Sequence, residues 1–82
     1  MSVEFENRLV ELRKALSRDT SEEWTQAKLA RKLRLSQNVI HRLEQGRGTI
    51  ENLAILLEFY HTKGYNIRWV LAPDNSKIRM YR

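Results

Sequence analysis

The stretch from 25 to 47, TQAKLARKLRLSQNVIHRLEQGR, most constrains what this chain can fold into. It contains two short helical patterns, Gln26 to Leu33 and Gln37 to Gln45, and the three residues between them are too few for a loop of any size. Two helices joined so closely must cross and pack against each other. The sequence therefore predicts a tightly connected helix pair at the centre of the fold.

The second pattern of this pair is strongly amphipathic. At 3.6 residues per turn, Val39, Ile40 and Leu43 fall on one face. The opposite arc carries only hydrogen-bonding side chains: Gln37, Asn38, His41, Arg42 and Gln45. A helix with an apolar underside and an outward row of donors and acceptors is suited to an anionic surface such as the DNA major groove.

The excess positive charge of the chain lies on the same two helices. The net charge is +5, and between Trp24 and Gly48 six basic residues accompany a single carboxylate, Glu44. Outside this stretch basic and acidic residues balance. Such clustering is the electrostatic footprint of a polyanion-binding protein, although a solvated basic face without a function is the alternative.

Composition argues against several other classes of protein. The 82 residues suffice for one modest core, and the absence of Cys excludes disulfides and thiolate metal sites. His41 and His61 lie twenty residues apart, and no carboxylate or thiol pattern converts them into a metal or catalytic pair, so we expect no enzyme activity, metal or cofactor. No apolar run approaches the ~20 residues that span a bilayer, and the N-terminus is charged, so we expect a cytoplasmic protein without a membrane partner.

The N-terminal part predicts a first helix from Val3 to about Ser17. Phe5, Leu9, Leu12 and Leu16 recur at helical spacing. Glu4 and Arg8 are spaced to pair on its outer face. The polar residues from 18 to 23 predict a connector, and Trp24 is interpreted as a lid on the core rather than as a stacking platform for bases.

Thr25 and Ser36 are predicted to cap the two helices of the pair, and Thr49 a fourth helix that runs from Ile50 to about His61. Gly64 is expected to stop it in the left-handed conformation. This helix carries one apolar stripe of Ile50, Leu53, Leu57 and Tyr60, and a second stripe of Ile55 and Phe59. Because a helix that is apolar on most sides must be buried on most sides, we expect the second stripe to meet the C-terminal segment or a second subunit.

After Gly64 the hydrophobic period changes from 3.6 to 2. Residues 65–71 alternate, a turn signal follows at 73–75, and residues 77–81 alternate again, which predicts a β-hairpin. A short helix over 66–71 is the alternative. Since an isolated hairpin is marginally stable, we expect it to pack on the fourth helix or to join its twin in a homodimer. The expected dimer-interface residues are Ile55, Phe59, Ile67, Trp69 and Leu71.

The residues from 25 to 57 resemble the helix-turn-helix of lambda-repressor and Cro-like (Xre-type) DNA-binding domains. T-Q opens the first helix of the pair with L-A in its middle, S-Q opens the second, and I-x-x-L-E-x-G and a further helix follow. The resemblance implies a mainly α fold, in which residues 1–64 form a four-helix domain and residues 65–82 a C-terminal strand or hairpin for dimerisation. The WTQ opening and the extended tail also resemble HipB-type antitoxins, whose C-terminal strands pair across a dimer. Arg34 departs from the family, which usually has Gly in this turn, so it must accept positive φ or alter the turn.

The resemblance also implies roles for residues. Gln26 would hold a phosphate, Gln37, Asn38 and Arg42 would reach base edges, and Arg13 would pair with Glu44. The chemistry of the side chains agrees, because Gln and Asn can bind adenine bidentately and Arg can bind guanine. His41 is either a further base or phosphate contact or a solvent-facing histidine without a role. The expected phosphate contacts are Gln26, Lys28, Arg31, Arg34, Gln45 and Arg47.

These expectations predict a sequence-specific regulator of transcription that binds double-stranded DNA as a homodimer and represses by occupying a two-fold-symmetric operator. One alternative is an antitoxin-type module that neutralises a toxin protein and regulates its own operon. A second is a general nucleic-acid binder without sequence preference.

Overall fold

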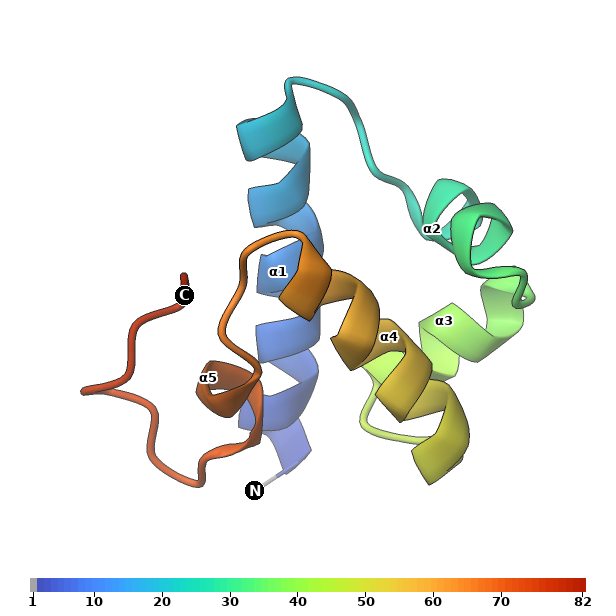
Figure 1. Ribbon diagram of the computed structural model, residues 1–82. Coiled ribbons are helices and arrows are strands. Elements are labelled where there is room, and N and C mark those ends of the chain that lie inside the picture. Colours follow the sequence, from blue (N-terminus) through green and yellow to red (C-terminus); the bar gives the residue numbers. More distant parts are fainter. Residues whose placement is uncertain (1) are drawn as a thin grey trace.

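The computed structural model describes residues 2–82, with side chains from Arg8 onward. It contains five helices in this range: α1 (Ser2–Thr20), α2 (Gln26–Leu33), α3 (Gln37–Glu44), α4 (Ile50–Thr62) and α5 (Ile67–Leu71). Helix α1 runs through the middle of the molecule, with α2 and α3 on one side and α5 and the C-terminal segment on the other (Figure 1). The first helix is longer than predicted, because it continues through Thr20 into the expected connector, and Ser21 ends it at a φ of 57°.

Local signals place the other helix boundaries as predicted. The hydroxyls of Thr25, Ser36 and Thr49 each accept a hydrogen bond from an amide in the first turn of α2, α3 and α4, respectively. Gly64 follows α4 with a φ of 100°, which confirms the left-handed stop.

The core forms where α1 meets the helix pair and α4. Leu9, Leu12 and Leu16 of α1 are buried as the spacing predicts, whereas the side chain of Phe5 lies outside the described residues. The buried core side chains of the other elements include Trp24, Leu29, Ala30, Ile40, Leu43, Leu56, Leu57, Phe59, Tyr60, Tyr65 and Val70.

Phe59 and Trp24 begin a chain of aromatic contacts through this core. Their ring centroids lie 5.7 Å apart, and Tyr60, Tyr65 and Tyr81 continue the chain. The prediction that Trp24 covers the core is confirmed, since 7% of it is exposed. Ile50 is expected to be buried with the other residues of its apolar stripe, but it is 84% exposed. It is the first residue of α4 and lies beyond the edge of the core.

The predicted C-terminal hairpin is wrong, and the alternative of a short helix is correct. Residues 67–71 form α5, and the described residues contain no strand; a single bridge joins Tyr65 to Tyr81. Within α5, Val70 is fully buried and Leu71 is half exposed. The predicted strand would have buried Leu71 and exposed Val70, so the observed burial fits a helix. The side chain of Asn66 caps α5 by accepting from the amide of Arg68.

Arg8 stabilises the other end of α5. Its guanidinium donates to the carbonyl oxygens of Val70 (2.8 Å), Ala72 (2.5 Å) and Pro73 (3.3 Å), the last groups of α5 and the residues after it. Arg8 is therefore buried, and the prediction that it lies on the outer face of α1 is wrong; the side chain of its expected partner Glu4 lies outside the described residues.

Candidate nucleic-acid interface

The helix pair places one face of α3 in the core and the other in solvent. Leu29 and Ala30 of α2 pack with Ile40 and Leu43 of α3, and all four are buried. Ser36 starts α3 by accepting from the amide of Val39 at 3.2 Å, which fixes the direction in which the helix leaves the turn. Burial of the underside therefore determines which residues of α3 face outward.

Arg34 makes the turn between the two helices in the left-handed conformation, with φ 59° and ψ 39°. The amide of Leu35 donates to the carbonyl oxygen of Ala30 at 2.9 Å, and the amide of Arg34 donates to that of Arg31 at 3.3 Å, which closes the end of α2. Of the two solutions that the sequence left open, the chain adopts positive φ. The side chain of Arg34 remains exposed.

We expect Arg34→Gly to raise the free energy of unfolding by about 0.5 to 1 kcal/mol. A side chain in this conformation costs roughly 1 to 2 kcal/mol, and the greater freedom of glycine in the unfolded chain offsets about half of that gain. Urea denaturation of the variant and the parent protein measures the difference. Arg31→Gly is the control, because a glycine inside α2 should destabilise by about 1 kcal/mol. A lower stability of Arg34→Gly would show that the turn carries no strain.

The four predicted base-contacting side chains lie on the outer face of α3. Gln37, Asn38, His41 and Arg42 are all exposed. The two ion pairs among the described residues do not involve Arg42. The outer face therefore offers amide donors and acceptors, an imidazole and a guanidinium on one short helix.

A buried carboxylate lies directly behind this face. Glu44 is 5% exposed and accepts two hydrogen bonds from Arg13, at 2.7 and 3.1 Å, which confirms the pair that the resemblance implied. The hydrogen bond to Glu44 raises the pKa of Arg13 although burial acts against it. Glu44 also accepts from the side-chain amide of Gln26 at 2.9 Å. Because that amide has a second N–H, Gln26 keeps a donor for the phosphate contact expected of it.

The predicted phosphate-contacting cations lie on α2, on the turn after it and on the loop before α4. Arg31, Arg34 and Arg47 are exposed. Lys28 is half-buried, because its ammonium lies over the ring of Trp24 at 4.5 Å and 3.4 Å from a carboxylate oxygen of Glu22. Sequence reasoning missed these contacts of Lys28, although a lysine four residues after an aromatic residue is a possible signal.

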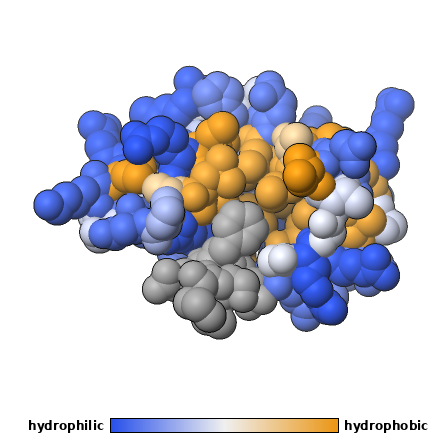
Figure 2. Space-filling model, turned by 90° about the horizontal axis from the view of Figure 1, so that it is seen from below, coloured by the Kyte–Doolittle hydropathy of each residue, from blue (hydrophilic) through white to orange (hydrophobic). Residues whose placement is uncertain are grey.

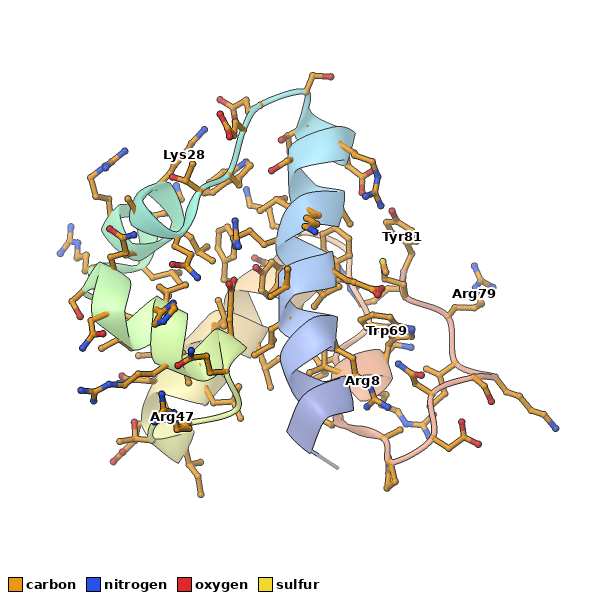
Figure 3. The ribbon with its side chains drawn as sticks, turned by 180° about the vertical axis from the view of Figure 1, so that it is seen from behind. Arg8, Lys28, Arg47, Trp69, Arg79 and Tyr81 are labelled. Atoms are coloured by element: carbon orange, nitrogen blue, oxygen red, sulfur yellow. The ribbon has the colours of Figure 1, made fainter. Side chains whose placement is uncertain are left out.

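Arg47 and Gln45 are connected to each other. The guanidinium of Arg47 donates to the side-chain oxygen of Gln45 at 2.7 Å, so the amide nitrogen of Gln45 remains as its donor. Figure 3 shows Arg47 and Lys28 on the same side of α1. The expected phosphate contacts thus form a basic margin on the side of the molecule that carries α3.

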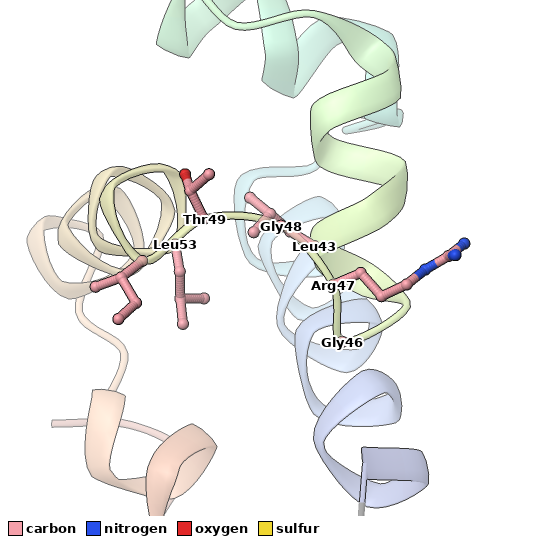
Figure 4. A pocket seen from close by; sticks show the side chains of 7 residues that line it. Leu43, Gly46, Arg47, Gly48, Thr49 and Leu53 are labelled. Carbon is pink, nitrogen blue, oxygen red and sulfur yellow. The ribbon is translucent and has the colours of Figure 1, made fainter.

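A small hollow lies between the end of α3 and the start of α4 (Figure 4). Its volume is about 80 Å³, too small for a cofactor. At Gly48 the φ is 121°, and a Cβ there would lie 2.9 Å from a methyl carbon of Leu43, so the loop needs glycine at this position. The lining residues are Leu43, Gly46, Arg47, Gly48, Thr49, Ile50 and Leu53.

The described residues hold no group of three or more His, Cys, Asp or Glu side chains placed to bind a metal ion. No helix among them has the length and apolar character needed to cross a membrane.

Comparison with known protein families connects this geometry to a function. A family model described as helix-turn-helix matches residues 11–64, which include all of α2, α3 and α4. Comparisons with curated proteins and with solved structures give no match.

Proposed function

This chain belongs to the helix-turn-helix family of DNA-binding regulators, and from that premise we propose that it represses transcription by occupying a two-fold-symmetric operator as a homodimer. The supporting observation is the outer face of α3, where Gln37, Asn38, His41 and Arg42 are exposed above a buried apolar underside. This arrangement matches the requirements of the major groove, which admits one helix and displays donors and acceptors on every base pair.

Within this proposal the side chains divide into two roles. Gln37, Asn38 and Arg42 read base edges, with His41 beside them, and sequence preference comes from these residues. The second group holds phosphates and sets the position of the domain without reading sequence. Its members are Gln26, Lys28, Arg31, Arg34, Gln45 and Arg47.

A single copy of α3 reads too few base pairs to define one site in a genome. Two copies related by a two-fold axis read half-sites about 34 Å apart, which supports a dimer. An apolar region occupies the middle of the face seen in Figure 2, and the start of α4 and α5 both lie toward that face in Figure 1. Ile50 (84% exposed) and Leu71 (50%) belong to these two elements. We infer that this face joins the two copies.

The five residues predicted for the dimer interface differ in how accessible they are in a single copy. Phe59 lies in the core, and Ile67 and Trp69 are half-buried against it. Ile55 (41% exposed) and Leu71 remain accessible. The proposed interface therefore keeps Leu71, adds Ile50 and leaves Ile55 as a comparison on a different side of α4.

Arg42→Ala tests the reading of sequence. We expect the variant to fold normally, because Arg42 is exposed, and to lose about 1 to 3 kcal/mol of discrimination at one position of each half-site. Selection of bound sequences from random duplex DNA, done with the parent and the variant, measures the preference. Arg31→Ala is the control and should weaken binding equally on all sequences. Identical preferences for the parent and Arg42→Ala would contradict the assignment and favour a general nucleic-acid binder.

Ile50→Glu and Leu71→Glu test the dimer. Each places a charge on the proposed interface, so we expect the dissociation constant of the dimer to rise by about tenfold or more while the melting temperature stays close to that of the parent. Sedimentation equilibrium measures the association. Dissociation by Ile55→Glu instead would move the interface to the other side of α4. A parent protein that is monomeric and co-purifies with a second protein would favour the antitoxin alternative.

A further inference from the structure

A second group of basic side chains lies on the side of the molecule away from α3. It consists of Arg68 on α5 and of Lys77 and Arg79 on the segment that follows, and all three are exposed. In Figure 3, Arg79 projects from the C-terminal segment on the opposite side of α1 from Lys28 and Arg47. The proposed operator-binding surface does not include this group.

Hydrogen bonds to the connector between α4 and α5 hold the segment in place. The amide of Asn66 donates to the carbonyl oxygen of Met80 at 2.7 Å, and its side chain donates to that of Arg79 at 3.1 Å. The amide of Arg82 donates to the carbonyl oxygen of Gly64 at 2.9 Å. These bonds fix the backbone of residues 79–82 relative to the connector, and the side chain of Arg79 is exposed.

Together α5 and the segment enclose a shallow, open hollow of about 340 Å³. No Asp or Glu side chain lines it, and the two ion pairs among the described residues involve none of its cations. The lining residues are Asn66, Arg68, Lys77, Ile78, Arg79, Tyr81 and Arg82. Several uncompensated cations around one hollow repel each other, and a bound polyanion would relieve this repulsion.

We propose that this hollow is a second binding site for the phosphate backbone of duplex DNA, so that one copy of the protein can hold two DNA segments. Guanidinium, ammonium and amide donors are the groups that contact phosphates, and such contacts need no apolar centre. A stable protein interface needs a desolvated aromatic or aliphatic anchor. The hollow offers only Ile78 and Tyr81 as apolar or aromatic groups, and they lie among four cations; Tyr81 is 44% exposed and its ring packs on Tyr65 with centroids 5.2 Å apart.

The two surfaces lie on opposite sides of α1. The molecule measures 32 × 28 × 18 Å, and α1 and α4 lie between α3 and the C-terminal segment (Figure 1). On this proposal the DNA bound by the hollow is a second duplex or a distant part of the same one.

Co-capture of two short duplexes of unrelated sequence tests the proposal. One duplex is immobilised and the other is fluorescent, and the parent protein is expected to retain the fluorescent duplex at low salt. Arg79→Glu should remain on the immobilised duplex but retain the fluorescent one about tenfold less, because a phosphate contact is replaced by a repelling carboxylate. Lys14→Glu, an exposed position on α1 with the same change of charge, is the control and should behave as the parent.

Three results would overturn the proposal. They are a parent protein that captures no second duplex, an Arg79→Glu protein that captures it as well as the parent, and Arg79-dependent binding of poly-glutamate in place of DNA, which would assign the hollow to an acidic protein partner. The proposal rests on DNA binding by α3, and the outcomes separate the two surfaces: if α3 does not bind DNA, Arg79→Glu also leaves the immobilised duplex, whereas failure of the hollow alone leaves the protein on the immobilised duplex without the fluorescent one.

Discussion

Glu44→Ala is expected to lower the free energy of unfolding by about 3 kcal/mol. Removal of one partner of a buried ion pair leaves an uncompensated charge and costs roughly 3 to 5 kcal/mol. The lower end applies here, because the side chain of Arg13 is 19% exposed and water can solvate it partly. Arg13 would keep its hydrogen bond to the carbonyl oxygen of Trp24 (3.2 Å), and Gln26 would lose its acceptor. Urea denaturation followed by circular dichroism measures the change.

The exposed ion pair of Lys28 with Glu22 provides the matched control for Glu44→Ala. Lys28 and Glu22 lie 3.4 Å apart with side chains 32% and 57% exposed, so solvent screens their attraction. Glu22→Ala should change the stability by less than about 1 kcal/mol. Equal losses of stability in Glu44→Ala and Glu22→Ala would mean that burial does not strengthen the ion pair of Arg13 with Glu44.

Much of the fold could be predicted from the sequence because its signals are local. A hydroxyl at Thr25, Ser36 or Thr49 meets amides three residues later, and Gly64 needs only its own backbone freedom. The outward direction of α3 also follows from a local pattern, the spacing of its apolar residues. The exposed positions of Gln37, Asn38, His41 and Arg42 agree with that pattern, while their contacts with bases stay predictions.

The part that could not be predicted depends on residues distant in the sequence. The alternation from 65 to 71 fits a strand as well as a short helix, and packing on α1 decides between them by burying Val70. Ile50 matches the apolar spacing of α4 but lies beyond the edge of the core, which spacing alone does not show. The pair of Arg13 with Glu44 spans 31 positions, and resemblance to a family, rather than spacing, indicated it.

Arg8→Met is expected to lower the free energy of unfolding by about 2 to 3 kcal/mol and to loosen α5 before the rest of the molecule. Met retains most of the apolar bulk of Arg8, but the carbonyl oxygens of Val70, Ala72 and Pro73 lose their common donor. A hydrogen bond with a charged donor contributes roughly 1.5 to 3 kcal/mol, and the exposed part of this region recovers some of the loss from water. Urea denaturation measures the global change.

Hydrogen exchange distinguishes loss of this cap from a general loss of stability. The hydrogen-bond acceptors of Arg8 all lie in α5 or directly after it, so amides of α5 should exchange faster in the variant while those of the helix pair open only with global unfolding. Lys14→Met, at an exposed position of the same helix, should leave both regions as in the parent. Equal acceleration in α5 and in the helix pair would mean that Arg8 supports the whole core, and unchanged exchange in α5 would mean that its carbonyl groups do not depend on Arg8.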